Sequence, residues 1–381
     1  MRVAFITTDN RDQLKNYGAV TPWFGPAPDA LLQGFALLPE VEVHAIVCAR
    51  EPMQSPEKVA PNIFFHCLVV PKIGWMSTLF QGCIRAVRQK LKEIQPHIAH
   101  GQGTEGHYAL SAVFSGFPNV VTIHGNMRRI AELEKPPTFS YNWFAARLER
   151  FAIPRTQGVV CITRYTQQAV AGLARQTWVV PNAVDASFLE VQAQPPEGAP
   201  PRILCVARVC PLKNQNALIR ALDPLAKRRK FELVFVGDAG KEAPYDVEFS
   251  RLVAERPWCS HVGFAGRAEL KAQMARASLL ALPSFEDNCP MVVLEAMVAG
   301  VPVLAARVGG VPDLITAGET GFFCDPHDAT SMSAGVEKVL HNPAAAAEVA
   351  RVAKARARER FHPRAVAQRH VEIYRQILAS R

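Results

Sequence analysis

Three acidic side chains lie close together in residues 283–312, PSFEDNCPMVVLEAMVAGVPVLAARVGGVP. Glu286 and Asp287 follow an apolar run, and Glu295 comes eight residues after Asp287. Carboxylates accept hydrogen bonds from hydroxyl groups, whereas the free backbone N–H groups at the start of a helix attract anions. If a helix starts after this acidic loop, the stretch suits a ligand that carries both sugar hydroxyls and phosphates.

Two cations stand at a comparable place earlier in the chain. Arg208 and Lys213 come directly after the apolar residues 203–207. Arginine can hold a phosphate through two parallel hydrogen bonds, and lysine acts as a point charge. The pair therefore suits a diphosphate, although two ordinary surface cations would give the same pattern.

Short apolar runs and helical segments must position these groups. Residues 279–282 are predicted to form a buried strand, residues 291–299 a helix that Gly300 closes, and residues 303–306 the next strand. This is one βαβ unit. Further short apolar runs indicate a parallel sheet flanked by helices in each half of the chain. They lie at 3–6, 43–47, 63–70, 98–101, 120–123 and 159–163 in the first half, and at 203–207, 233–236 and from 261 in the second.

The stretch resembles the nucleotide-sugar site of retaining GT-B glycosyltransferases of the family-4 type. That family has an acidic residue, seven residues and then a glutamate, which Asp287 and Glu295 match. Ala296-Met297, Gly300, Pro302-Val303 and Gly309-Gly310 follow the same pattern. Most members have glutamate at the first acidic position, and Glu286 stands one place earlier here. Either Asp287 or Glu286 could therefore meet the donor sugar.

The resemblance implies a role for each matching residue. Arg208 and Lys213 would bind the donor pyrophosphate together with the N–H groups that follow Asp287, and Glu295 would bind the ribose hydroxyls. His124 follows the predicted strand 120–123 and precedes Gly125, like a family histidine that approaches the donor sugar; a purely structural histidine is the alternative. The other residues expected to bind the nucleotide are Gly237, Gly266, Arg267, Asn288, Cys289 and Met291.

The resemblance also implies a fold: α/β of the GT-B type, with two Rossmann-like domains that face each other across a cleft. A length of 381 residues suits two domains. We expect an acceptor-side domain at 1–190, a proline-rich linker at 191–201 and a nucleotide-sugar-binding domain at 202–364. The final helix, 365–381, is expected to pack back on the first domain.

Composition limits the other classes of protein. The chain is 49% hydrophobic and 20% charged, which excludes a disordered protein, and no apolar run reaches the ~20 residues of a membrane span. The start MRVAFITTDN is typical of a strand and not of a signal peptide. Nine cysteines without metal-ligand spacing indicate reduced, buried thiols in a cytoplasmic protein. No DxD motif follows the strand at 233–236, so neither a metal nor another cofactor is expected.

The net charge of +9 bears on the partners. Residues 1–182 carry 18 Lys and Arg against 12 Asp and Glu, a balance of +6; residues 183–381 carry 25 against 22, a balance of +3. Attraction of an anionic substrate explains this, as does contact with an anionic membrane surface. Because neither a helix-turn-helix nor an RNA-binding signature is present, no nucleic acid is expected.

The predicted function is thus a retaining, metal-independent glycosyltransferase of polysaccharide biosynthesis. It would move a sugar from a nucleoside-diphosphate sugar, with UDP favoured and GDP possible, to a glycan or lipid-linked acceptor. The protein would be cytoplasmic, with a possible peripheral contact to the cytoplasmic face of the membrane. A nucleotide-sugar epimerase or a non-catalytic nucleotide-sugar-binding protein of the same fold is the alternative.

Overall fold

The computed structural model describes residues 1–240 and 243–380. It divides into two compact units, Met1–Asp185 with Phe361–Arg381 and Ala186–Arg360. The proline-rich segment predicted as a linker belongs to the second unit, because its backbone bonds there. The N–H of Ala193 donates to the Ala299 carbonyl (3.0 Å) and the N–H of Gln194 to the Ala275 carbonyl (2.8 Å).

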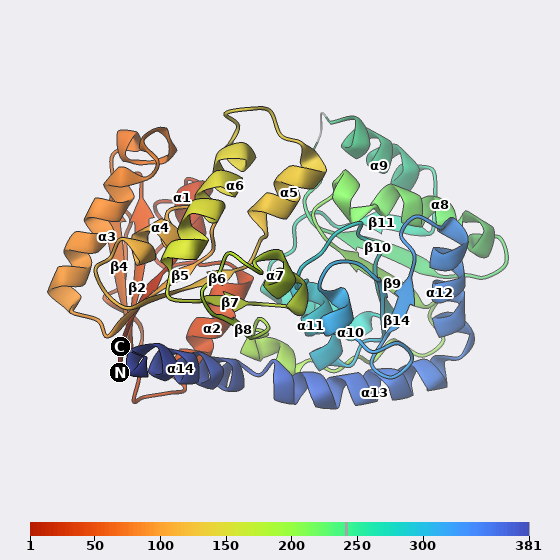
Figure 1. Cartoon of the computed structure of the whole chain (residues 1–381). Helices are drawn as coiled ribbons and strands as arrows, with labels where there is room; N and C mark the ends of the chain where they lie inside the picture. Colours follow the sequence, from red (N-terminus) through yellow and green to blue (C-terminus); the bar gives the residue numbers. More distant parts are fainter. Residues whose placement is uncertain (241–242, 381) are drawn as a thin grey trace. The chain divides into compact units, whose positions relative to one another are not determined.

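The first unit contains a sheet of eight strands in the order β3-β4-β2-β1-β5-β6-β7-β8 (Figure 1). All pairs are parallel except that of β3 and β4 at one edge. The strands are β1 (Arg2–Ile6), β2 (Glu42–Ala49), β3 (Lys58–Ala60), β4 (Ile63–Val69), β5 (Ile98–Gln102), β6 (Asn119–Ile123), β7 (Val159–Cys161) and β8 (Thr177–Val179).

Helices cover both faces of this sheet because successive strand residues point to opposite sides. Val3 and Phe5 pack with α2 (Pro26–Ala36) and α14 (Pro363–Ala379). Ala4 and Ile6 pack with α3 (Gln81–Ile94), α4 (Tyr108–Val113) and α6 (Tyr141–Ala152). The first unit also contains the helices α1 (Asn10–Gln13), α5 (Met127–Glu134) and α7 (Arg164–Ala169).

The last helix returns to the first unit, as expected. In Figure 1, α14 lies beside α2, and the two helices are in extensive contact. Gly34 in α2 allows this approach, because a Cβ there would come within 2.1 Å of the Pro363 carbonyl oxygen. Tyr374 is completely buried in the same core.

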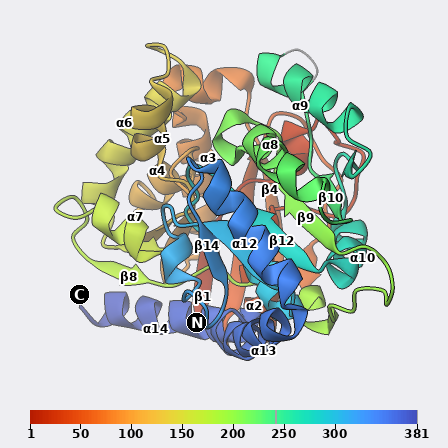
Figure 2. The ribbon, with the colours of Figure 1, turned by 90° about the vertical axis from the view of Figure 1, so that its right-hand side faces the viewer.

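The second unit has a six-stranded, all-parallel sheet in the order β11-β10-β9-β12-β13-β14. The strands are β9 (Arg202–Val206), β10 (Glu232–Val236), β11 (Cys259–His261), β12 (Leu279–Leu282), β13 (Val303–Ala306) and β14 (Phe322–Cys324). On one face lie α8 (Gln215–Ala226), α9 (Pro244–Ala254) and α12 (Ala329–His341); Figure 2 shows α8 and α12 side by side over the strands. The other helices are α10 (Arg267–Arg276), α11 (Met291–Ala299) and α13 (Pro343–Arg360).

The predicted strand, helix and strand of residues 279–306 are confirmed with the same bounds. In α11, Gly300 provides the left-handed C-cap with φ +84°. The prediction of a strand that starts at 261 was wrong, since β11 ends at His261. Gly263 has φ +81°, which takes the chain out of the extended conformation.

In each sheet the order of the strands reverses at one position. In the second unit β10 and β11 follow β9 on one side, and β12 lies on the other side of β9. In the first unit β2 and β5 likewise lie on opposite sides of β1. Open α/β sheets bind ligands at such switch points, beyond the carboxyl ends of the strands. None of the helices in the described ranges is both long and apolar enough for a membrane span.

Candidate active site

The switch point of the second unit brings two predicted groups together. The loop after β9 carries Arg208 and Lys213, and the loop after β12 carries Glu286 and Asp287. Because β9 and β12 are neighbours, their loops meet. The N–H of Phe285 donates to the Leu212 carbonyl (2.8 Å), and the Lys213 ammonium lies 2.6 Å from Oδ1 of Asp287.

The Lys213–Asp287 ion pair is well shielded from water. The two side chains are only 22% and 11% exposed, so solvent screens their attraction less than that of a surface pair. Oδ2 of Asp287 is buried and has no hydrogen-bond partner within the described residues. A buried acceptor without a partner is costly, so this oxygen is ready to accept a hydrogen bond from a ligand hydroxyl.

The glycine pair of the motif supports the acidic loop. Gly309 has φ +51°, and a Cβ there would lie 2.1 Å from the Asp287 carbonyl oxygen and 3.3 Å from Oε1 of Glu286. The N–H of Gly310 donates to that same Asp287 carbonyl (2.9 Å). Only glycine at 309 lets the loop after β13 approach so closely.

Gly237 has a similar part beside the cation loop. It follows β10 with φ +140°, and a Cβ there would lie 2.2 Å from the Ala207 carbonyl oxygen and 3.1 Å from the Arg208 nitrogen. The side-chain amide of Gln215 donates to the Arg208 carbonyl (3.0 Å). These contacts fix the backbone of Arg208, whose side chain is exposed.

The remaining predicted residues of this unit occupy three places. Asn288 and Cys289 continue the acidic loop, Met291 begins α11, and Glu295 is buried on that helix. Pro290, the N-cap of α11, makes no side-chain cap. Gly266 and Arg267 are exposed at the start of α10, which follows the outer strand β11.

His124 belongs to the first unit, directly after β6. Its Nε2 lies 3.0 Å from Oε1 of Gln102. Because that oxygen can only accept, Nε2 carries the proton and donates. Burial lowers the pKa of His124 to about 4, so the ring is neutral near pH 7.

Comparisons with known proteins identify the family of the chain. The profile described as "Glycosyl transferases group 1" matches residues 189–360, and "Glycosyltransferase Family 4" matches residues 36–188. Together the two adjoining profiles account for most of both units. The chain belongs to the GT-B glycosyltransferases of the family-4 type.

Individual relatives match a smaller part of the chain than the two profiles do together. Glycogen synthase of Mycobacterium tuberculosis is 30% identical over 203 residues, 53% of this chain and 49% of that protein; the chain thus spans about half the length of this relative.

Two solved structures show the GT-B fold over the whole chain. Sucrose-phosphate synthase of Thermosynechococcus elongatus has a TM-score of 0.79 at 18% identity and full coverage of both chains. Anabaena HepE in complex with UDP-glucose has a TM-score of 0.73 at 19% identity, with 99% and 100% coverage.

Sequence reasoning missed the hydrogen-bond network behind His124 in this GT-B chain. The Gln102 amide donates to Nε2 of His100 (2.9 Å), which also lies 2.7 Å from Oγ1 of Thr122. Nδ1 of His100 lies 2.6 Å from the hydroxyl of Tyr374. Polar residues inside otherwise apolar strands were the available signal, but the partner in α14 is 274 residues away.

A carboxyl group at the first unit's switch point was also missed. Glu105 lies in the loop after β5, and burial raises its pKa to about 7. The N–H of Thr104 donates to its Oε2 (2.9 Å). Gly103, at φ +107°, leaves room for this carboxylate, because a Cβ there would lie 2.5 Å from both its oxygens.

Proposed function

We propose that the chain transfers a sugar from a nucleoside-diphosphate sugar to a glycan or lipid-linked acceptor, with retention of the anomeric configuration. The observation that carries the proposal is the shielded Lys213–Asp287 pair at the switch point of the second unit. It joins a cation suited to phosphate with a carboxylate suited to sugar hydroxyls. HepE, whose structure contains UDP-glucose, makes a UDP-sugar the favoured donor, with a GDP-sugar as the alternative.

The difficult step is departure of the nucleoside diphosphate, which gathers negative charge as the bond to the sugar C1 breaks. Arg208, Lys213 and the N–H groups at the start of α11 would stabilise that charge. Such preorganised donors are often the largest catalytic contribution, about 3 kcal/mol for a single donor. With these groups in place the reaction would need no metal ion.

Asp287, rather than Glu286, would bind the donor sugar. Its Oδ1 holds Lys213 at 2.6 Å, and its buried Oδ2 can accept a sugar hydroxyl. Glu286 instead has its Oε1 close to Gly309. Glu295 would bind the ribose hydroxyls.

His124 would position the sugar as a neutral hydrogen-bonding group, since its pKa of about 4 leaves it uncharged near pH 7. The acceptor oxygen would form its bond to C1 on the face that the diphosphate leaves, and its proton would pass to the departing phosphate oxygen. The configuration at C1 is then retained.

Two carboxamide variants test the assignment of the donor sugar contact. Asp287→Asn should lower kcat/KM for transfer by about tenfold or more, and Glu286→Gln, the matched control, should change it by less than about threefold. Equal losses would contradict the assignment. Proton NMR of the first product formed reads the anomeric configuration, and an inverted product would contradict retention. Transfer without any added divalent metal ion is expected.

Incubation with the nucleotide sugar, with and without an acceptor, distinguishes a transferase from an epimerase and from a binding protein. An epimerase would convert the nucleotide sugar without an acceptor, and a binding protein would leave it unchanged with every acceptor. We expect slow hydrolysis alone and fast transfer with an acceptor. Chromatography of the sugar products distinguishes the three outcomes.

A surface of the first unit favours an acceptor carried in an anionic membrane. Arg85, Arg88 and Lys92 are exposed on α3. Before this helix, Ile73 and Leu79 are 74% and 46% exposed, beside a surface hollow of about 530 Å³. Basic residues next to exposed apolar side chains suit an interface with anionic lipids.

Vesicle flotation tests this part of the proposal. The wild type should float with vesicles of anionic phosphatidylglycerol at low salt and not with neutral phosphatidylcholine. The double variant Arg85→Ala, Arg88→Ala should lose this binding, whereas Arg228→Ala, Lys230→Ala in the second unit should keep it. No flotation of the wild type would remove the membrane from the proposal.

A further inference from the structure

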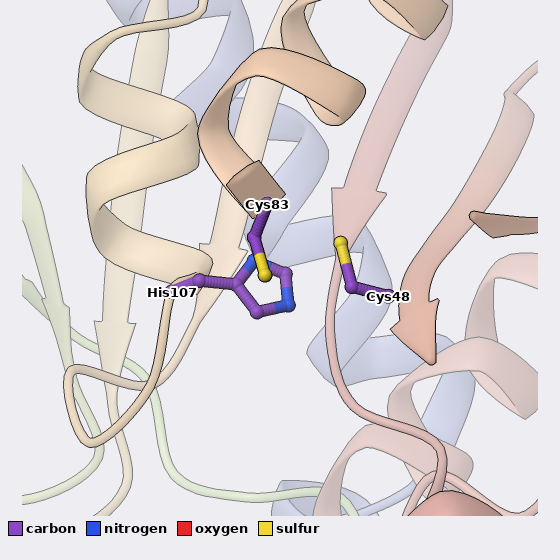
Figure 3. Close-up of side chains that lie close together, drawn as sticks. All are labelled: Cys48, Cys83 and His107. Atoms are coloured by element: carbon purple, nitrogen blue, oxygen red, sulfur yellow. The ribbon is translucent and has the colours of Figure 1, made fainter. Parts of the chain in front are cut away.

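Three side chains that commonly bind metals converge inside the first unit, apart from the residues assigned above. Cys48 lies near the end of β2, Cys83 in the first turn of α3, and His107 directly before α4. Their ligand atoms all lie within 4.8 Å of one another, and Figure 3 shows the three side chains together. Each residue is at most 3% exposed, so the cluster is shielded from bulk water.

The imidazole is held in a suitable orientation. Nδ1 of His107 lies 3.1 Å from Oγ of Ser111, one turn into α4. Histidines that bind a metal usually donate their other ring N–H to an oxygen acceptor, and the Ser111 hydroxyl can accept it here. If Nδ1–H donates to Ser111, Nε2 is the nitrogen that remains for an ion.

The donor set selects the ion. Two thiolates and an imidazole favour Zn²⁺ or Cu⁺. Zn²⁺ with two thiolates is neutral overall, whereas Cu⁺ would leave a net negative charge among the apolar neighbours Phe80 and Tyr108. Ligand atoms around tetrahedral zinc are about 3.4–3.8 Å apart, so the present spacing requires only small side-chain movements.

We propose that Cys48, Cys83 and His107 bind one Zn²⁺ ion, with water or another small ligand in the fourth position. Binding would release the two thiol protons. The ion would tie β2, α3 and α4 together beside the loop that carries Glu105. Its role would be structural, because its three buried ligands come from three different elements of the first unit.

Zinc affinity of the reduced, metal-free protein tests the proposal. Competition with a chromophoric chelator should give one tight equivalent for the wild type and for Cys161→Ala, which removes another buried cysteine of the same unit. Cys83→Ala should bind at least about 100-fold more weakly, and Ser111→Ala about 10–100-fold more weakly. Zinc should raise the unfolding temperature of the wild type and Cys161→Ala but not of Cys83→Ala.

Cobalt gives a readout on the wild type that does not depend on a variant folding. Co²⁺ should produce a sulfur-to-metal charge-transfer absorption band that one equivalent of Zn²⁺ removes. Absence of tight zinc binding by the folded, reduced wild type would overturn the proposal, as would unchanged affinity in Cys83→Ala. A Cys48–Cys83 disulfide in air, found by thiol counting, together with no zinc binding after reduction, would also overturn it.

Discussion

The two units place their candidate site residues in opposite surroundings. In the second unit the groups are charged and lie on loops, where Arg208 is exposed and Lys213 retains 22% exposure. In the first unit His124 stands at the end of a chain of neutral hydrogen-bonding groups inside the sheet. Full burial of a cation is expensive, whereas a neutral imidazole with partners is not. In the proposed reaction, charge for the leaving group would therefore be kept near solvent, and fixed orientation would be supplied from the core.

Removal of the loop cation should have the largest effect. Lys213→Ala should lower kcat by about 100–1,000-fold, the range found when one preorganised donor is lost, with the fold intact. Initial rates of sugar transfer measure this. Lys227→Ala, an exposed lysine next to α8, is the control and should remain near wild type. Near-wild-type rates for Lys213→Ala would contradict the role proposed for the charged loop of the second unit.

Low pH should instead destabilise the first unit, whose histidines are neutral. Burial lowers the pKa of several histidines below the usual 6.5. Between pH 6.5 and 4 these groups therefore bind more protons in the unfolded chain than in the native one. The free energy of unfolding consequently decreases as the pH is lowered. Glu105 and Glu149, whose pKa values burial raises, act in the opposite direction but are fewer. The histidines are His66, His124 and His370 with pKa values of about 4, and His100, also lowered.

All four of these histidines lie in the first unit. Hydrogen exchange followed by mass spectrometry at pH 7 and pH 5 should show protection falling more in the first unit than in the second. Equal losses in the two units would contradict the assignment of neutral, buried imidazoles to the first.

Substitution of two glycines of the second unit tests whether the acidic loop depends on the glycine pair. Gly309→Ala places a Cβ 2.1 Å from the Asp287 carbonyl at φ +51°, so it should cost about 1–3 kcal/mol of stability and weaken nucleotide binding. Gly266→Ala has open space at its Cβ and an ordinary φ of −69°, and should be close to neutral in stability. Thermal unfolding compares the stability of the two variants, and the shift that UDP produces is compared between Gly309→Ala and the wild type. Equal losses of stability would show that the acidic loop does not depend on the glycine pair.

The smallest effect is expected at the far end of the neutral network. Tyr374→Phe removes the hydroxyl 2.6 Å from Nδ1 of the buried His100 ring. We expect a loss of about 1–2 kcal/mol in the free energy of unfolding, measured by chemical denaturation, with little change in KM for the donor. A large rise in that KM would mean that the network controls donor binding directly.

The sequence predicted the elements that carry the charged residues of the second unit far better than the contacts of the neutral network in the first. The bounds of β12, α11 and β13 were predicted because apolar runs, Gly300 and Pro302 mark each end. Arg208, Lys213, Asp287 and Gly309 follow strand ends that become neighbours in a parallel sheet, so local pattern sufficed.

The missed features depend on contacts that local patterns do not encode. The bond from His100 to Tyr374 joins residues 274 apart. The cluster of Cys48, Cys83 and His107 draws on three separate elements, so its spacing matches no short metal motif. The bonds of Ala193 and Gln194 to the second unit's backbone likewise give no compositional signal within a proline-rich segment.

The central claim is that the second unit binds a nucleoside diphosphate through Lys213. The most direct measurement is calorimetric titration of the wild type and Lys213→Ala with UDP, GDP and ADP. The account predicts that one of them, with UDP favoured, binds the wild type at one site per chain, and that Lys213→Ala binds it at least about tenfold more weakly. If the folded wild type binds none of the three, or if Lys213→Ala binds as tightly as the wild type, the account is contradicted.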